Sequence, residues 1–479
     1  MEAATAARIE RVPMLIGGEW RYGATEYEVR DPYRGEAVSL VPESTAEDLD
    51  AAIAAAAAAK DAAAATPGYE RAALLDRVGQ LLAERADAIA EIMTRETGKA
   101  LKDSRAEIAR SRDTIRLSAE EAVRIQGEHV PLDATAMGAG KLAMLLRFPV
   151  GVVAGITPFN APFNLAAHKV APALAAGNSI VLKPPPQAAL VVHKLVELFV
   201  DAGVPAGFLN VVYGNTVGPL LVRDPRVDFV TFTGSTRVGA EIKAASGLRR
   251  VALELGGTGQ TIVHADADIE EAAPVCARNA MRLAGQSCAS VQNIYAHESL
   301  YDRFVERVAE EVRKLRIGDP LDPDTDVGTL IDEAAARRVE SWVKEAVERG
   351  ARLLAGGGRH GAQIEPTLLV DVDPSMQVVC NEVFGPVASI QRYSDVEAMF
   401  RLVSDAPLGL QCGIYTKSLE VAIRAAQRIR SGAVIINGTS TWRTDQLPYG
   451  GVKNSGIGRE GPHYAIREMT EERLVVFNL

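Results

Sequence analysis

Residues 150–156 (VGVVAGI) begin the part of the sequence that decides the fold. Further short apolar segments follow at residues 179–182, 209–212 and 229–232, and the stretches between them show helical periodicity. Continuous runs of Val, Ile and Leu are typical of strands buried on both faces, as in parallel sheets built from βαβ units. We therefore predict an α/β fold with a parallel sheet.

A second α/β region extends from residue 251 to residue 436. Its candidate strands lie at residues 261–263, 293–295, 388–390 and 434–436. These segments are again short and rich in β-branched residues, which predicts a second parallel sheet.

Three helices are predicted before the first sheet. Residues 44–47 (STAE) form a capping-box pattern that begins an Ala-rich helix ending near residue 65. Alanine has the highest helix propensity, so this run predicts a helix rather than disorder. Residues 70–97 and 101–126 keep apolar residues at helical spacing, and Gly98 separates the two helices.

Two extended segments, residues 128–132 and 142–148, predict a hairpin between the α/β regions. Residues 474–477 (LVVF) predict a terminal strand with no local partner. A strand of this kind pairs with a distant sheet edge or with another subunit, because its backbone groups need partners.

Charge argues against one class of partner. The chain of 479 residues has 52 Lys and Arg against 62 Asp and Glu, a formal net charge of −10, and it has no dense basic block. We therefore expect no nucleic acid as a partner.

The cysteines and the N-terminus predict a cytoplasmic compartment. The four cysteines show no CxxC pair and no His at zinc spacing, so we expect neither a disulfide framework nor a metal site. The first eight residues contain an early acid, Glu2, and no apolar stretch long enough for a secretory signal. The apolar runs are also too short to span a bilayer, so no membrane attachment is expected.

Cys288 lies in residues 284–290 (AGQSCAS). An isolated cysteine is usually a small buried hydrophobe, and Cys276, Cys380 and Cys412 keep that interpretation. Cys288 differs because small residues precede it at the expected end of a helix, where backbone can approach a ligand closely. It is the candidate nucleophile.

Glu254 lies in residues 251–257 (VALELGG), which place a carboxylate in the middle of an apolar strand. Burial of a carboxylate is costly and raises its pKa toward the range of a general base. The alternative is a strand-end Glu paired with a surface Arg. The two glycines that follow permit close backbone approach and favour a functional role.

Three further signals follow predicted strands. Asn160 comes after residues 150–156, where its amide could donate to an oxyanion, although such an Asn alone is more often a turn residue. Lys183 ends the next strand, at the sheet edge where α/β folds bind ligands. Residues 234–239 (GSTRVG) form a turn and a helix start that would present N–H groups to a pyrophosphate.

These signals occur in one order along the chain: Asn160, Lys183, 234–239, Glu254, Cys288 and then 382–386 (EVFGP). The order resembles that of the NAD(P)-dependent aldehyde dehydrogenase superfamily. The branch most similar contains lactaldehyde, phosphonoacetaldehyde and non-phosphorylating glyceraldehyde-phosphate dehydrogenases. The resemblance extends from residues 16–20 (IGGEW) to residues 448–456 (PYGGVKNSG), which is nearly the whole chain.

The resemblance implies an aldehyde dehydrogenase-like fold, with two Rossmann-type parallel-sheet domains and a small bridging or oligomerisation element. Residues 1–126 and 149–253 would form the cofactor-binding domain, and residues 254–437 the catalytic domain. Residues 127–148 and 438–479 would form the bridging element. This element would complete a sheet in a partner subunit, which implies a homodimer or homotetramer.

The resemblance also implies the roles of three residues. Cys288 would attack the aldehyde carbonyl as a thiolate, and a thiohemiacetal and then a thioester would follow. The Asn160 amide and the Cys288 backbone N–H would hold the oxyanion. Glu254 would activate the water that hydrolyses the thioester.

The residues implied to contact the cofactor are Pro158, Lys183, Gly234, Ser235, Glu382 and Phe384. Lys183 would bind the adenine ribose hydroxyls, Ser235 the phosphates and Glu382 the nicotinamide ribose. Phe384 would pack beside the nicotinamide ring.

Two departures bear on this comparison. Relatives that prefer NAD commonly have a Glu at the position of Pro186, where it shares the ribose hydroxyls. Without that carboxylate a 2′-phosphate is not repelled, so NAD and NADP both stay open, with NAD slightly favoured. The second departure is Ser287, where some relatives that take phosphorylated aldehydes have an Arg.

Arg110 and Arg443 are the candidate substrate residues. In the branch named above, the position of Arg110 can face an anionic end of the substrate, and Arg443 lies in residues 439–445 (TSTWRTD), which also resemble that branch. The alternative is that both arginines form ion pairs. A small polar or anionic aldehyde is therefore expected, and the sequence does not identify which one.

Three other functions compete with this one. In a CoA-acylating semialdehyde dehydrogenase, CoA would take the acyl group, but such relatives usually lack a base at Glu254. A Cys-dependent ester or amide hydrolase would need a His that folding brings to Cys288. A non-catalytic binding or lens-type structural protein would not need Cys288 and Glu254 together.

Overall fold

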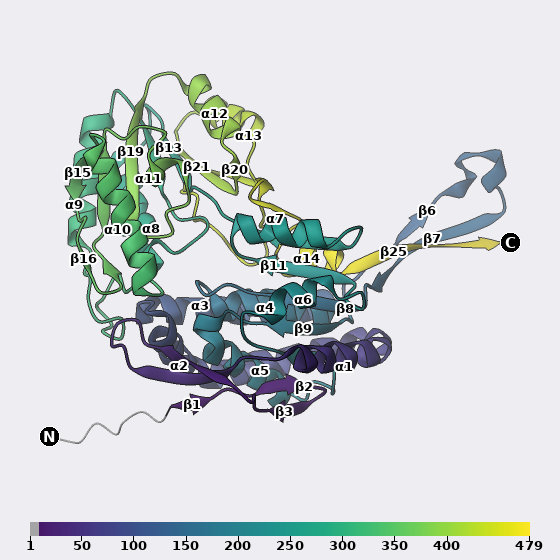
Figure 1. The fold of residues 1–479 in the computed structure, drawn as a ribbon. Coiled ribbons are helices and arrows are strands. Elements are labelled where there is room, and N and C mark those ends of the chain that lie inside the picture. The colour runs from purple at the N-terminus through teal and green to yellow at the C-terminus, as the bar shows by residue number, and fades with distance from the viewer. Residues whose placement is uncertain (1–8) are drawn as a thin grey trace.

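The computed structural model of this chain describes residues 9–479. Two α/β lobes lie one above the other in Figure 1, and an arm projects from one side of the molecule. The predicted α/β fold with two parallel sheets is confirmed. The prediction about a secretory signal concerns residues 1–8 and lies outside the described residues.

The sheet of the lower lobe is parallel in its centre and antiparallel at both edges. Its strand order is β24 (Gly456–Ile457), β12 (Arg250–Glu254), β11 (Phe229–Thr233), β8 (Val152–Ile156), β9 (Ser179–Lys183), β10 (Leu209–Val211), β2 (Met14–Ile16) and β3 (Glu19–Arg21). Strands β8, β9 and β11 are buried along their whole length, as continuous apolar runs predict.

Helices cover both faces of this sheet. On one face lie α1 (Ala46–Ala65), α6 (Val217–Arg223) and α7 (Thr236–Ala245). On the other lie α4 (Pro162–Ala175) and α5 (Ala189–Asp201), with α2 (Gly68–Thr97), α3 (Leu101–Ala122) and α14 (Pro462–Glu468) packed outside them. Helix α4 is buried at every residue, since it lies between the sheet and this outer layer.

The sheet of the upper lobe is parallel except for its first strand. Its order is β15 (Arg352–Ala355), β18 (Thr367–Val370), β19 (Val387–Tyr393), β14 (Asn293–His297), β13 (Gln260–Val263), β21 (Gln411–Tyr415) and β22 (Ala433–Ile436). The helices of this lobe are α8 (Ile269–Met281), α9 (Tyr301–Lys314), α10 (Glu333–Glu348), α11 (Gln377–Cys380), α12 (Val396–Asp405) and α13 (Leu419–Arg428).

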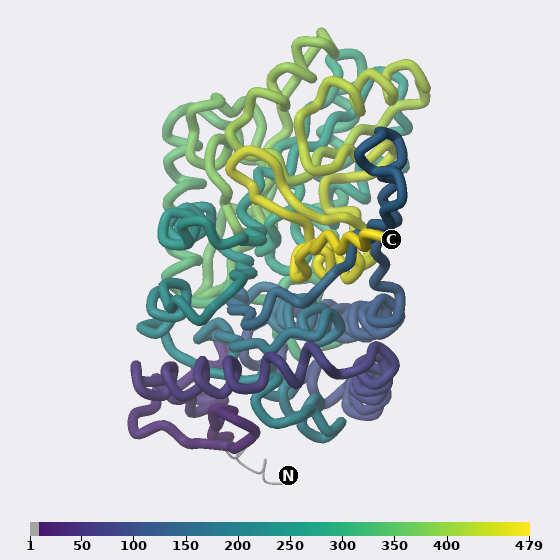
Figure 2. Tube along the Cα trace, turned by 90° about the vertical axis from the view of Figure 1, so that its right-hand side faces the viewer, coloured from purple at the N-terminus to yellow at the C-terminus, as the bar shows by residue number. Residues whose placement is uncertain are grey.

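The arm consists of β6 (Glu128–Val130), β7 (Lys141–Pro149) and β25 (Thr470–Asn478). Strand β25 pairs antiparallel with β7 over its whole length, and Figure 2 shows the yellow C-terminal end of the chain beside the blue hairpin segment. The expectation that the terminal strand has no local partner and joins a distant sheet edge is therefore confirmed. Its partner is the hairpin, which is more than 300 residues away in sequence, so local sequence could not reveal the pairing.

Small sheets and short turns complete the fold. They are β1 (Glu10–Arg11) with β5 (Ala37–Pro42) and β4 (Glu26–Arg30), β16 (Arg359–His360) with β17 (Gln363–Ile364), and β20 (Leu408–Gly409) with β23 (Val452–Lys453), together with 3₁₀ turns at Leu132–Ala134, Ala136–Gly138, Pro186–Ala188 and Arg282–Gly285. Within the described residues, every helix is too short or too polar to span a bilayer.

Two helix boundaries differ from the prediction. Helix α1 is capped by Thr45 with Asp48, one residue later than the predicted box at 44–47, because Ser44 bonds the backbone of Tyr213 instead. Helix α3 ends at Ala122 rather than near residue 126. The chain leaves the helix early because it turns toward β7, where Gly127 packs so closely that a Cβ would lie 2.1 Å from the Leu145 carbonyl.

Candidate active site

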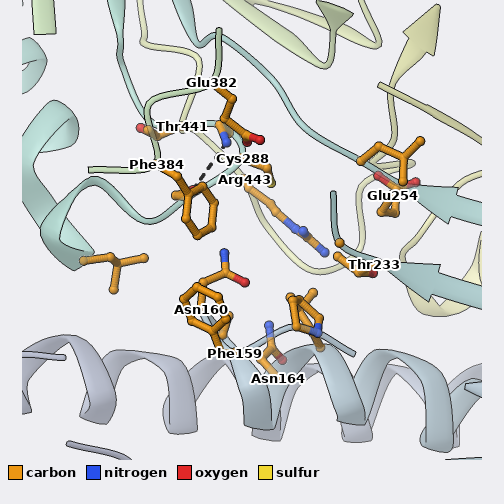
Figure 3. A pocket seen from close by; sticks show the side chains of 18 of the residues that line it. Phe159, Asn160, Asn164, Thr233, Glu254, Cys288, Glu382, Phe384, Thr441 and Arg443 are labelled. Carbon is orange, nitrogen blue, oxygen red and sulfur yellow. Dashed lines mark hydrogen bonds between the residues drawn. The ribbon is translucent and has the colours of Figure 1, made fainter. Parts of the chain in front are cut away.

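A cavity of about 400 Å³ lies beyond the carboxyl ends of β8, β11 and β12, and segments that precede β14 and β19 form its opposite wall (Figure 3). The predicted residues that line it are Arg110, Pro158, Asn160, Gly234, Ser235, Glu254, Cys288, Glu382, Phe384 and Arg443. Lys183 does not line this cavity, although it ends β9 at the same edge of the sheet.

A strained turn leads the chain to Cys288. Leu283 and Ala284 have left-handed φ angles of 56° and 49°, a conformation that costs a non-glycine residue roughly 1–2 kcal/mol. Gly285 follows with φ 69°, and a Cβ there would lie 1.9 Å from the Gly385 carbonyl. The turn therefore depends on glycine at residue 285, and it places Cys288 in the cavity wall.

The Cys288 thiol is half-buried and lies 3.2 Å from the phenol oxygen of Tyr449. Burial raises the pKa of the thiol to about 11, although the hydrogen bond from Tyr449 lowers it. The charge on Glu382 raises the pKa further and that on Arg443 lowers it. The thiol therefore needs its polar neighbours if it is to ionise near neutral pH.

Glu254 is the last residue of β12, so its expected place in the middle of a strand is wrong. The strand ends there because Leu255 bonds the Ser455 carbonyl instead of continuing the ladder with β11. The Glu254 side chain is buried, and neither carboxylate oxygen has a hydrogen-bond partner in the described residues. Burial, and then the negative charge of Glu460, raise its pKa well above the ordinary value.

Lys169 and Glu460 lie behind Glu254 and were not predicted. The Lys169 ammonium is fully buried on α4, 2.8 Å from the Thr233 hydroxyl and 3.4 Å from a Glu460 oxygen. Burial opposes ionisation of Glu460, but His168, Lys169 and Arg443 together lower its pKa to about 2. Glu460 is thus a charged carboxylate with partners, whereas Glu254 is a carboxyl without them.

Asn160 extends from the loop after β8 into the space below Phe384 and Arg443 (Figure 3). Its neighbour Phe159 meets Phe384 edge to face, with ring centroids 5.8 Å apart. The Asn160 amide lines the same cavity as the Cys288 sulfur, so it can donate to an oxyanion formed beside that sulfur.

The residues at the strand ends fit a dinucleotide. Lys183 is buried, which lowers its pKa to about 8, and it has polar contact with the Pro184 carbonyl 3.1 Å away. Ser235 caps the N-terminus of α7, a position suited to a phosphate. Glu382 accepts a bond from the Gly257 N–H at 3.3 Å, and burial raises its pKa to about 7. Lys183 thus provides a cation, the N-terminus of α7 provides backbone N–H groups, and Glu382 provides a carboxylate that can accept hydrogen bonds from ribose hydroxyls.

Arg110 and Arg443 both line the cavity, and both form ion pairs. Arg110 donates two hydrogen bonds to Asp445, at 2.7 and 3.2 Å. Arg443 donates to Glu460 at 2.8 Å and lies over the Tyr449 ring, 3.8 Å from its centroid. The alternative of ion pairing therefore describes both side chains, and their contact with a substrate stays a prediction.

Arg282 is a further cavity residue that the sequence analysis did not single out. In residues 9–479 its side chain makes no ion pair and no hydrogen bond, unlike those of Arg110, Arg443 and Arg338. It lies six residues before Cys288, on the strained turn. Because Arg282 stands only six residues before the candidate nucleophile, its position in the sequence could have identified it as a cavity residue.

Comparisons with known proteins agree with the resemblance found in the sequence. The model of the aldehyde dehydrogenase family matches residues 20–475. The 3-sulfolactaldehyde dehydrogenase of Priestia aryabhattai is 44% identical over 475 residues, which are 98% of this chain and 99% of that protein. Aldehyde dehydrogenase 21 from Physcomitrella patens, solved with the reaction product succinate, has a TM-score of 0.96 and 39% identity, and the match covers 98% of this chain and 99% of that one. The NADP-dependent glyceraldehyde-3-phosphate dehydrogenase from Bacillus halodurans C-125, complexed with NADP, has a TM-score of 0.95 and 37% identity at the same coverage.

Proposed function

This chain belongs to the aldehyde dehydrogenase family, and we propose that it oxidises a small anionic aldehyde to the acid through a thioester on Cys288. The observation that carries the proposal is that Cys288, Asn160 and Glu254, from three separate parts of the sequence, line one cavity. A nucleophile, an oxyanion donor and an unpaired base are the groups that this reaction needs.

The chemistry follows from these side chains. The Cys288 thiolate adds to the carbonyl carbon, and the Asn160 amide donates to the oxygen that becomes negative. When bound, NAD(P)+ accepts the hydride that leaves this carbon. Glu254 then takes a proton from water as the water attacks the thioester, and the C–S bond breaks to release the acid and the Cys288 thiolate.

Glu254 suits this role because of what surrounds it. Its raised pKa makes the carboxylate a stronger base than an exposed glutamate, and its free oxygens leave room for a water. An unpaired base also favours hydrolysis over transfer to CoA. Among the described residues, the hydrogen-bond partner of the Cys288 sulfur is Tyr449 and not a histidine, which disfavours a Cys-His hydrolase.

For the cofactor, we propose that Lys183 binds the adenine ribose, Ser235 the phosphates and Glu382 the nicotinamide ribose. Pro158, Gly234 and Phe384 complete the contacts from the cavity wall. Pro186 provides no carboxylate that would repel a 2′-phosphate, so both NAD and NADP are accepted. The NADP complex of the Bacillus halodurans relative supports this breadth.

For the substrate, we propose that Arg282 binds the anionic end. It is the cavity arginine whose side chain makes neither an ion pair nor a hydrogen bond in the described residues. Arg110 is the proposed second partner, because its side chain keeps 38% exposure beside Asp445. Arg443 is held by Glu460 and contributes its charge to the cavity from behind Tyr449. Sulfonate and carboxylate groups occur in the compounds named for two relatives, sulfolactaldehyde and succinate.

We further propose a homodimer or homotetramer formed through the arm. Strand β25 is an edge strand, and its apolar side chains Leu474, Val476 and Phe477 are 42–54% exposed. Sedimentation of the purified protein tests this. A cytoplasmic location is also proposed, since all four cysteines are free thiols.

The test of function is the absorbance of reduced cofactor with a panel of aldehydes. We expect turnover with sulfolactaldehyde or succinic semialdehyde, with NAD+ or NADP+, and weaker turnover with neutral propanal. Cys288→Ala is the control, and it should lose turnover while it still binds NAD(P)H, as measured by fluorescence. Undiminished oxidation by that variant would remove the assignment of the nucleophile.

A further inference from the structure

Tyr449 is the hydrogen-bond partner of the Cys288 sulfur in the described residues. Its phenol oxygen lies 3.2 Å from Sγ, within normal range for a bond that involves sulfur. The ring is buried and packs with Ala289 and Leu410 against Cys288. The contact is therefore made in the cavity wall.

The backbone of Tyr449 is fixed. Its N–H donates to the Glu460 carbonyl at 3.1 Å, and the Glu460 N–H donates back to the Tyr449 carbonyl at 2.7 Å. The same Glu460 holds Arg443, whose guanidinium lies over the Tyr449 ring. One buried carboxylate residue thus anchors both the main chain of the tyrosine and the cation on its ring.

This arrangement defines the direction of the hydrogen bond. Burial raises the pKa of the Tyr449 phenol well above its ordinary value, so the O–H stays protonated. A protonated phenol can donate to a thiolate, and a bond to a charged acceptor is stronger than one between neutral groups. The cation over the ring also draws electron density from the phenol, which makes the O–H a better donor.

The burial of Cys288 makes such a donor necessary. A dehydrated thiol resists ionisation, and the nearby carboxyl groups Glu254 and Glu382 resist it further. No histidine is among the residues that line the cavity in residues 9–479. The groups that favour the thiolate there are the Tyr449 phenol and, behind it, the charge of Arg443.

We propose that Tyr449 is a catalytic residue of this chain, which donates a hydrogen bond to the Cys288 thiolate and holds it ready for attack. The S–H bond breaks, its electron pair stays on sulfur and the proton passes to solvent water, which reaches the half-buried Cys288 from the cavity. The Tyr449 O–H bond stays intact throughout. The proposal rests on the proposed function in one respect, namely that Cys288 is the nucleophile.

The test is alkylation of Cys288 by iodoacetamide as a function of pH, without aldehyde or cofactor, followed by mass spectrometry of the Cys288 peptide. Tyr449→Phe keeps the ring, its packing and the stacked Arg443, and removes the hydroxyl alone. We expect the alkylation rate constant at pH 8 to fall by about 10- to 100-fold, the range for a lost hydrogen bond to a charged group. The value of kcat/KM at the same pH should fall to a similar extent.

Tyr213→Phe is the matched control. Tyr213 is also fully buried, but its hydroxyl has no hydrogen-bond partner in the described residues, so its removal should change neither rate. An alkylation rate in Tyr449→Phe equal to that of the wild type, across the pH range, would overturn the proposal and leave Tyr449 as a packing residue.

The same experiment separates the two proposals. If Cys288→Ala stays active, the proposed function fails, while the alkylation rates of Tyr449→Phe still report on the hydrogen bond to the thiol. If Cys288→Ala is inactive and Tyr449→Phe matches the wild type in both alkylation and kcat/KM, the function stands and the role of Tyr449 fails.

Discussion

The carboxylate of Glu460 lies 3.4 Å from the ammonium nitrogen of Lys169, and both side chains are buried behind the end of β12. Arg443 adds a second cation to Glu460 at 2.8 Å. Glu254 ends β12 beside this cluster without a hydrogen bond of its own in the described residues. The buried cations thus ionise one carboxyl fully and leave its neighbour as a base with a raised pKa.

The first prediction concerns pH. The charge of Lys169 lowers the pKa of Glu254, against the larger effect of burial. Lys169→Met removes that charge, so the pKa of Glu254 rises and its basic form appears only at higher pH. We expect the acidic limb of the kcat profile to move up by about one pH unit. Stopped-flow or steady-state kinetics between pH 5 and 9 measure this shift.

Lys102→Met is the control for the loss of the Lys169 charge, because it removes a lysine charge far from Glu254. Lys102 forms an exposed ion pair with Asp326, so its loss should leave the profile unchanged. An acidic limb that stays in place in Lys169→Met would mean that another group controls deacylation.

Glu254→Gln should separate the two halves of the reaction. The amide has nearly the same shape but accepts no proton, so thioester hydrolysis should slow by about 10²- to 10⁴-fold, the usual contribution of a general base. Hydride transfer does not need this base, and a burst of NAD(P)H equal to the enzyme concentration should therefore precede slow turnover. Rapid-mixing absorbance at 340 nm measures the burst. Loss of NAD(P)H binding in this variant would instead make Glu254 a structural residue.

A third prediction concerns the buried pair Lys99–Glu107. Glu107 also accepts the N–H groups of Phe163 and Asn164, both at 3.0 Å, at the start of α4. Lys99→Met leaves this buried carboxylate without its cation, which costs about 3–5 kcal/mol. We expect a clearly lower thermal unfolding midpoint, measured by calorimetry.

Two variants make that stability test specific. Lys99→Met/Glu107→Gln removes the stranded charge as well, so it should recover part of the lost midpoint. Lys102→Met, three residues further along the chain and at the start of α3, breaks an exposed pair and should cost about 0–1 kcal/mol. Equal midpoints for Lys99→Met and Lys102→Met would contradict the argument from burial.

The parallel strands of the lower sheet could be predicted because β8, β9 and β11 are apolar along their length. Strand β21 (Gln411–Tyr415) could not, since Gln411 and Gly413 interrupt the pattern. Both serve contacts with the chain after β22: Gln411 donates to the Ser440 carbonyl at 2.6 Å, and a Cβ on Gly413 would lie 2.4 Å from the Gly438 carbonyl. These tertiary contacts override β-propensity and cannot be detected in a local window.

The residues of the candidate site also fall into those that local sequence could predict and those that it could not. Cys288, Asn160 and Glu254 were predictable because each stands in a distinctive local setting whose order resembles a family. Lys169 was not singled out, although a lone lysine in the Ala-rich segment of α4 is itself a signal of buried charge. Its partner Glu460 is 291 residues away, and only the fold brings the two together.

The last prediction concerns the substrate. Arg282→Ala removes the cavity arginine whose side chain has neither an ion pair nor a hydrogen bond in the described residues, so a carboxylate or sulfonate would lose its strongest partner. We expect KM for succinic semialdehyde to rise by about 10- to 100-fold, as for the loss of a hydrogen bond between charged groups. The kinetics of propanal, which carries no charge, should stay within twofold, because the reacting groups are untouched.

Two further variants show which arginine binds the anion. Arg110 is paired with Asp445, so Arg110→Ala should raise the same KM less than Arg282→Ala does. Arg349→Ala, which breaks an exposed pair with Glu345, should leave both substrates unaffected. A contact between Arg282 and the carboxylate would affect succinic semialdehyde and leave propanal unchanged. If Arg282→Ala raises KM equally for the two aldehydes, then Arg282 shapes the turn before Cys288 and does not bind the anionic end.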